Sequence, residues 1–459
     1  MIPMKTFLMA GVILFAVAGV LRIKAAELRI PFERYTLENG LRVILSRDNA
    51  APVVAVYLIY DVGARDEEKG RTGFAHLFEH MMFQGSKNVP KGVHFKTVEA
   101  NGGNLNGSTH ADFTDYFEVL PSNKLPVALW LEADRMRGLS ITNENLDNQK
   151  EAVKQERRMS FDNAPYATAI IDVWPTVFFR NWQSSHSLIG SFEDLNAATT
   201  ADVAAFFKTY YAPNNAVLVV VGDFETATAK KLIETCFAGI PAQPRPRRPD
   251  LAEPAWNGPR SGTYHDALAQ VPAVVIGWPG PKRRSPDYYA MVLLDVILTA
   301  GSSSRFYLNL VKGRESVVQY EANLGWPLSG PSDYVDPGAY AMMLLHKPDF
   351  TSAQIVTQVE AEIARIGKEG VPAAEMNRAR TFLRSDRIRG VRTSIRRAQL
   401  LGQYEVFDGD PNLINTELDK LLGVTPEQVR QAAIRYCDPA RRAVLEIVPG
   451  PAGKKAGGN

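Results

Sequence analysis

A helix–turn–strand pattern occurs twice in this sequence, and both copies keep the same order of residues. The copies are Thr199, Val203, Tyr210, Pro213, Val217, Leu218 and Gly222, and then Thr425, Val429, Tyr436, Pro439, Val444, Leu445 and Gly450. They are offset by 226 residues up to the proline and by 227 or 228 residues after it. Such a repeat predicts two related domains of roughly 200 residues each, although two amphipathic helix–strand units can also be alike by chance.

Strand and helix patterns mix along the rest of the chain without strict βαβ alternation. Strands are expected at 41–45, 52–60, 110–119 and 217–221, and helices from about residue 74 and over 146–161. This mixture favours an α+β fold in which sheets are covered by helices.

The predicted domains are separated by residues 241–262, which are rich in Pro, Gly and Arg and have no apolar period. We therefore expect a first domain at 27–240, a second domain at 263–450 and a flexible tail at 451–459.

The N-terminus has the pattern of a secretory signal. Lys5 precedes an uncharged apolar run, Phe7–Leu21, and small residues follow at Ala25-Ala26. The run is short for a membrane span, so we expect residues 1–26 to be removed and the mature chain to have no span. An uncleaved anchor is the alternative. Either way, the pattern predicts a secreted or periplasmic bacterial protein.

The net charge and the cysteine content constrain the partners and the disulfide pairing only weakly. The net charge of +2, from 52 basic and 50 acidic residues, gives no reason to expect nucleic acid or an anionic membrane as the main partner. Two cysteines, Cys236 and Cys437, are present, and in an oxidising compartment they can either pair or remain as two buried thiols.

The segment His76-Leu-Phe-Glu-His80 carries the clearest chemistry. On a helix, His76 and His80 lie one turn apart on the same face and can bind one Zn²⁺ ion. Glu79 lies on the same side and can reach a water molecule as a general base without ligating the metal. A chance pairing of two histidines is the alternative, but His-x-x-Glu-His is also the inverted motif of zinc peptidases.

A catalytic zinc needs a third protein ligand and one open position. The predicted helix after residue 146 offers two acids, Glu151 and Glu156. With Glu156 placed 76 positions after His80, the chain resembles the pitrilysin/insulinase family, in particular its small two-domain branch with mitochondrial processing peptidase and bacterial homologues. The resemblance implies that Glu156 is the third ligand, with one zinc per chain.

The resemblance also implies a fold and a substrate site. It implies two homologous domains, each a largely antiparallel sheet covered by helices, which enclose a cleft for peptides or unfolded segments. The stretch Gly103–Thr109 resembles the family's edge strand, so Asn104, Asn106 and Gly107 are expected to bind substrate. Relatives usually have Ala at the position of Gly107, which should make this strand looser.

Two departures from the family pattern carry predictions. Gln149 stands where relatives often have a glutamate that supports the ligand, so metal affinity is expected to differ. Relatives that act alone have an arginine seven residues before a substrate-binding tyrosine. Here Tyr320 is present, but Gly313 stands seven residues before it and Arg314 is one position off. The resemblance then implies a hetero-oligomer in which a homologous subunit supplies the Arg/Tyr pair, with a homodimer as second choice.

These observations predict a zinc-dependent endopeptidase subunit, with Glu79 as base. A catalytically silent structural or peptide-binding subunit is the alternative, and a purely structural zinc site is a third reading, although such sites usually have four protein ligands. His110 is expected to be a half-exposed side chain more often than a substrate contact. The arginines over 378–397 favour a solvated face or a subunit contact rather than an RNA site.

Overall fold

The computed structural model describes residues 29–325, 334–335 and 338–450. The expected signal at 1–26 and the expected tail at 451–459 lie outside these residues. Among the described helices, none is both long and apolar enough to cross a membrane.

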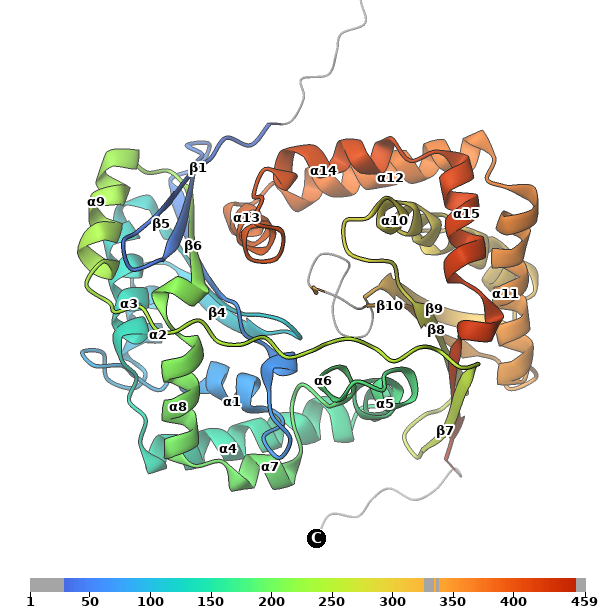
Figure 1. Cartoon of the computed structure of the whole chain (residues 1–459), viewed down its shortest axis with the longest axis horizontal. Coiled ribbons are helices and arrows are strands. Elements are labelled where there is room, and N and C mark those ends of the chain that lie inside the picture. The colour runs from blue at the N-terminus through green and yellow to red at the C-terminus, as the bar shows by residue number, and fades with distance from the viewer. Residues whose placement is uncertain (1–28, 326–333, 336–337, 451–459) are drawn as a thin grey trace, which may run out of the picture.

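The strands form two sheets (Figure 1). The first sheet has the order β1-β2-β6-β3-β5-β4 and is built from Glu33–Thr36, Arg42–Arg47, Val53–Tyr60, Asn104–Thr109, Thr114–Pro121 and Ala216–Gly222 for β1 to β6. The second has the order β7-β11-β8-β10-β9 and is built from Arg260–Asp266, Ala273–Pro279, Val317–Leu324, Ala339–His346 and Ala443–Pro449 for β7 to β11.

Fifteen α-helices lie in the described parts of the chain. In chain order, α1 to α15 are Phe74–Met81, Val93–Ala100, Leu125–Arg137, Asn143–Arg157, Trp174–Phe178, Trp182–Ser185, Phe192–Ala197, Thr200–Tyr210, Thr226–Phe237, Pro286–Thr299, Ser352–Glu369, Ala373–Gly390, Ser394–Asp408, Leu413–Leu422 and Pro426–Tyr436.

The strand order confirms the repeat. In both sheets a parallel pair, β2·β6 or β7·β11, is followed by three antiparallel pairings that end at an edge strand, β4 or β9. The repeated threonines begin the helices of the unit, because Thr199 and Thr425 form capping boxes with Asp202 and Gln428. The expected α+β fold with largely antiparallel sheets is therefore present.

Each sheet buries both faces, and one face is covered by a helix from the other half of the chain. Helix α13 lies on β3 and β6 of the first sheet, where Leu401 and Tyr404 pack against Tyr57 and Val219. Helix α5 packs on the second sheet through Trp174 and Phe178. Figure 1 shows α13 beside the first sheet although its neighbours in sequence surround the second. The two halves thus exchange covering helices, which the sequence did not predict.

Several boundaries differ from the sequence expectation. Helix α4 begins at Asn143 rather than near 146, and a π-helical turn, Arg158–Asp162, continues it. Strand β5 begins at Thr114, because residues 110–113 form the turn after β4. The expected linker has neither helix nor strand up to Pro259, but β7 begins at Arg260, inside the expected 241–262 range.

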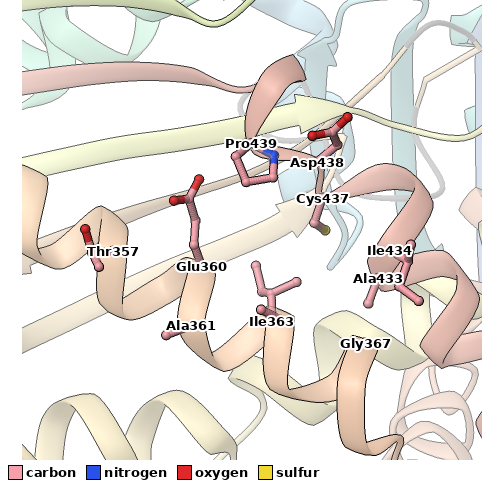
Figure 2. Close-up of a pocket in the computed structure, with 11 residues that line it drawn as sticks. Thr357, Glu360, Ala361, Ile363, Gly367, Ala433, Ile434, Cys437, Asp438 and Pro439 are labelled. Atoms are coloured by element: carbon pink, nitrogen blue, oxygen red, sulfur yellow. The ribbon is translucent and has the colours of Figure 1, made fainter.

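The two cysteines do not pair. Cys236 lies on α9, whereas Cys437 lies just after α15, beside an open pocket of about 540 Å³ between α11 and α15 (Figure 2). Burial raises the pKa of the Cys437 thiol well above its usual range. Cys437 is thus a neutral core residue.

Candidate metal centre

Helix α1 carries three of the predicted residues, and its start is fixed by a backbone crossing. Gly73 precedes the helix with a φ of 81°, and a Cβ there would lie 2.5 Å from the carbonyl oxygen of Ile189. Gly190 has a φ of 79° and faces the same crossing, since its Cβ would lie 2.3 Å from the oxygen of Thr72. Only glycine fits both positions, so the crossing sets where α1 begins.

The buried carboxylate of Glu67 holds the first turn of α1. It accepts hydrogen bonds from the backbone nitrogens of Gly73 at 2.9 Å and Ala75 at 2.7 Å. Nε2 of His186 lies 3.1 Å from the same carboxylate. A negative charge at a helix N-terminus is favourable, and here it satisfies two of the unpaired N–H groups of the helix.

Helix α4 brings Glu156 to the two histidines. Oε2 of Glu156 lies 3.7 Å from Nε2 of His76 and 3.3 Å from Nε2 of His80. The three ligand atoms all lie within 4.8 Å of one another, so the group could hold one metal ion. Glu151 points elsewhere and pairs with Lys154 on the exposed face of α4.

The protonation states suit a cation. Burial, and then the neighbouring His80, lower the pKa of His76 to about 4, so His76 is neutral at neutral pH. Burial also acts to lower the pKa of His80, but its hydrogen bond to Glu156 and the nearby negative charges outweigh this and raise it. The same hydrogen bond lowers the pKa of Glu156, which is therefore ionised.

Gln149 selects the tautomer of His80. Its Oε1 lies 3.3 Å from Nδ1 of His80, and because an amide oxygen only accepts, Nδ1 carries the proton. Nε2 faces the Glu156 carboxylate, and the hydrogen bond between them places a proton at a position that a metal ion could take instead. The residues present therefore fit a bound cation of the kind that imidazole and carboxylate ligands prefer.

Glu79 lies beside this group but faces the edge strand. Its Oε2 accepts a hydrogen bond from Oγ1 of Thr109 at 2.7 Å. Burial raises the pKa of Glu79 to about 7, against the effect of the Thr109 hydrogen bond. A divalent cation next to this carboxyl would lower that pKa again.

Three predicted substrate residues lie on β4, which is the edge of the first sheet. Asn104 and Asn106 are exposed, and Oδ1 of Asn106 accepts from the backbone nitrogen of Gly107 at 3.0 Å. A Cβ on Gly107 would lie 3.0 Å from Tyr116 and 3.2 Å from Phe83, so an alanine there would need both rings to shift slightly.

Tyr320 is not brought to this group. It lies on β9 of the second sheet, and its hydroxyl donates to the carbonyl oxygen of Thr299 at 3.0 Å and lies 2.9 Å from Oγ of Ser304. Arg314 is exposed just before β9. His110 stacks on Phe113, with 4.1 Å between ring centroids.

A second cluster of similar residues lies deeper in the first sheet. His94, Glu118 and Glu132 also place their ligand atoms within 4.8 Å of one another, but all three are buried. Arg135 forms a two-pronged ion pair with Glu132 and lies over the ring of Tyr116 at 4.3 Å. The guanidinium already supplies the positive charge that this cluster needs.

The geometry of the first group, a His-x-x-Glu-His helix beside a carboxylate from a second helix, is that of the inverted-motif zinc peptidases. Residues 42–191 match the family model "Insulinase (Peptidase family M16)", and residues 197–383 match "Peptidase M16 inactive domain". This chain therefore belongs to the pitrilysin/insulinase family of zinc peptidases, M16.

Similar proteins and solved structures support the same family assignment. "Zinc protease PqqE" of Helicobacter pylori is 27% identical over 383 residues, which cover 82% of this chain and 83% of that protein. A crystal structure of a protease from Helicobacter pylori has a TM-score of 0.83 at 24% identity and covers 92% of this chain and 100% of that one. The periplasmic protease PqqL from Escherichia coli has a TM-score of 0.73 at 19% identity and covers 92% of this chain but 48% of its own.

Two residues of the site escaped the sequence analysis. Thr109 was placed on the edge strand but not linked to Glu79, although a polar side chain at a strand end near the motif was a usable signal. Glu67 gave no local signal, because its partners on α1 and at His186 are defined only by the fold.

Proposed function

We propose that this chain is a zinc-dependent endopeptidase subunit that cleaves peptides or unfolded segments. The observation that carries the proposal is the convergence of His76, His80 and Glu156 with Glu79 held beside them. The three converging side chains would hold one Zn²⁺, which supplies Lewis acidity to a peptide carbonyl and to a water molecule.

The remaining steps belong to residues of this chain. Glu79 takes a proton from the attacking water and returns it to the leaving amine. Oε2 of Glu79 accepts the hydrogen bond from Thr109, so Oε1 of Glu79 is the oxygen that receives the proton. Gln149 keeps the Nδ1 proton on His80, so that Nε2 stays available as a ligand.

The edge strand β4 is the proposed binding strand for the peptide. No described strand pairs with its outer edge, so an extended peptide can pair with its backbone. Asn104, Asn106 and Gly107 would lie along this peptide, next to Thr109 and Glu79. Such binding favours extended substrates over folded ones.

We also propose that the active enzyme is a hetero-oligomer, with a homodimer as second choice. The hydroxyl of Tyr320 is engaged with Thr299 and Ser304 of its own half, so another chain would supply the Arg/Tyr pair. PqqL supports this, because this chain matches only 48% of it, and a second chain would take the place of the remainder. The signal pattern at 1–26 supports a secreted or periplasmic location.

The test is hydrolysis of a quenched fluorescent peptide library by the chain alone and with a homologous chain encoded next to it. Activity that needs the partner and falls about 10²–10⁴-fold in Glu79→Gln, with zinc retained, supports the proposal. Glu99→Gln, an exposed glutamate on α2, is the matched control and should stay active. A zinc-loaded chain without activity in any combination would instead indicate the silent subunit.

A further inference from the structure

The arginines of α12 and of the turn after it separate into two sets. Arg380 and Arg387 face inward: Arg380 donates to the carbonyl oxygen of Val424 at 2.8 Å, and Arg387 donates to that of Ile414 at 2.6 Å. The outward set, here called the α12 face, consists of Arg378, Arg384, Arg389 and Arg392 with the apolar residues Phe382 and Ile388.

The α12 face is cationic and partly apolar. Phe382 is 39% exposed and Ile388 is 47% exposed, so the arginines of this face stand beside apolar surface. Asp386, 3.6 Å from Arg389, is the acid that pairs on this face. The near-zero charge of the whole chain therefore hides a local excess of positive charge.

The chain enters the described fold at the same end of the molecule. The backbone nitrogen of Ile30 donates to Oδ1 of Asn415 at 2.7 Å, and Nδ2 of Asn415 donates back to the oxygen of Ile30 at 3.0 Å. Asn415 is on α14, next to the Ile414 carbonyl that Arg387 of α12 binds. The described chain therefore begins against α14, which packs on the inward side of α12.

We propose that the α12 face is a docking surface for the anionic headgroups of a phospholipid bilayer. Arginines attract anionic lipids, while exposed Phe and Ile side chains can enter the interface between headgroups and acyl chains. The surface holds the enzyme at a membrane with or without its N-terminal run, and it is separate from the metal site.

The experiment compares binding to vesicles of phosphatidylglycerol and phosphatidylethanolamine with binding to neutral phosphatidylcholine vesicles. The measured quantity is the ratio of the two partition coefficients, and because Lys5, Arg22 and Lys24 flank the apolar run, the α12 face is tested by the change of this ratio in variants that keep the same N-terminus. The full chain should prefer the anionic vesicles at least about tenfold, and high salt should remove this preference.

The variant Arg384→Glu with Arg392→Glu should lower the ratio at least about tenfold, because no other side chain in the described structure contacts these two residues within hydrogen-bond range. The matched control is Lys208→Glu with Lys231→Glu, two exposed lysines on α8 and α9, which should keep the ratio within about threefold. Both variants should keep the wild-type peptide hydrolysis, which shows that they fold.

Three results would overturn the proposal. The first is a ratio near one for the unaltered chain, and the second is an equal loss in the lysine control. The third is a change of oligomeric state in the arginine variant without a change in the ratio, which would make the α12 face a subunit contact.

Discussion

The first half of the chain contains two clusters of histidine and glutamate, one of His76, His80 and Glu156 and one of His94, Glu118 and Glu132. They differ in which group neutralises the negative charge of the glutamates. In the His76 cluster the carboxylate of Glu156 is half-exposed and faces two imidazoles, and within the described ranges no arginine pairs with it. In the His94 cluster the carboxylates are buried and Arg135 is built in. Ligand-type residues within reach of one another therefore do not define a metal site. We propose that such a site needs an accessible carboxylate that no arginine of the described residues neutralises.

The largest expected effect tests the first cluster. Glu156→Gln should weaken zinc affinity more than roughly 100-fold, because it removes a ligand, whereas loss of a residue that only supports a ligand costs at most about 100-fold. Zinc per chain after dialysis against a chelator measures this. Glu151→Gln, on the exposed face of the same helix, is the control and should keep its zinc. The opposite pattern would reassign the third ligand.

The next effect tests the second cluster. Arg135→Met should destabilise the fold by about 3–5 kcal/mol, because it leaves the buried carboxylate of Glu132 without its cation. Urea unfolding measures the loss, and zinc content should not change. Adding Glu132→Gln to this variant should restore part of the stability. If Arg135→Met instead gained a second equivalent of zinc, the two clusters would differ only by that arginine.

A smaller effect is the pH dependence of the second cluster. Burial raises the pKa of Glu118 to about 8, and burial followed by Arg135 lowers that of His94 to about 4. Between pH 4.5 and 6.5 the folded and unfolded pairs each hold about one proton. Above 6.5 the unfolded histidine loses its proton while folded Glu118 keeps one to about pH 8.

The folded state thus binds more protons between pH 6.5 and 8, so stability should fall across this window by about 2 kcal/mol as pH rises. Urea unfolding at each pH measures the fall, and Glu118→Gln should remove it. A fall of the same size in Glu118→Gln would place its origin outside the second cluster.

The smallest effect returns to the first cluster. Gln149→Glu would place a carboxylate at Nδ1 of His80, which should raise the basicity of the imidazole and tighten zinc binding about tenfold. Gln149→Met should weaken binding by a similar factor. Competition with a fluorescent zinc chelator measures both. Equal affinities for all three would mean that the 3.3 Å contact does not act on the ligand.

The parts that could be predicted from sequence are those fixed by short-range spacing. The pairing of His76 with His80 follows from the spacing of one helical turn, and the role of the repeated threonines follows from their position at the start of a helix. The spacing alone does not decide between Glu151 and Glu156 on α4, and only the family resemblance selects Glu156 as the third ligand. Thr109, Glu67 and the Gly73–Gly190 crossing depend on segments brought together by the fold, and no local pattern signals such contacts. The sequence predicts strand at 110–113, because an apolar alternation continues through these residues, whereas they form a turn.

The exchange of helices α13 and α5 has a consequence for how the chain is made. During synthesis the first sheet emerges early, but the apolar face that includes Tyr57 and Val219 stays bare until α13 follows. Neither half can therefore finish folding as a separate unit on the ribosome, and the usual order of N-terminal domain first does not apply. A chain that completes its core only when its last third arrives stays open longer, and we expect its two halves to unfold in a single event.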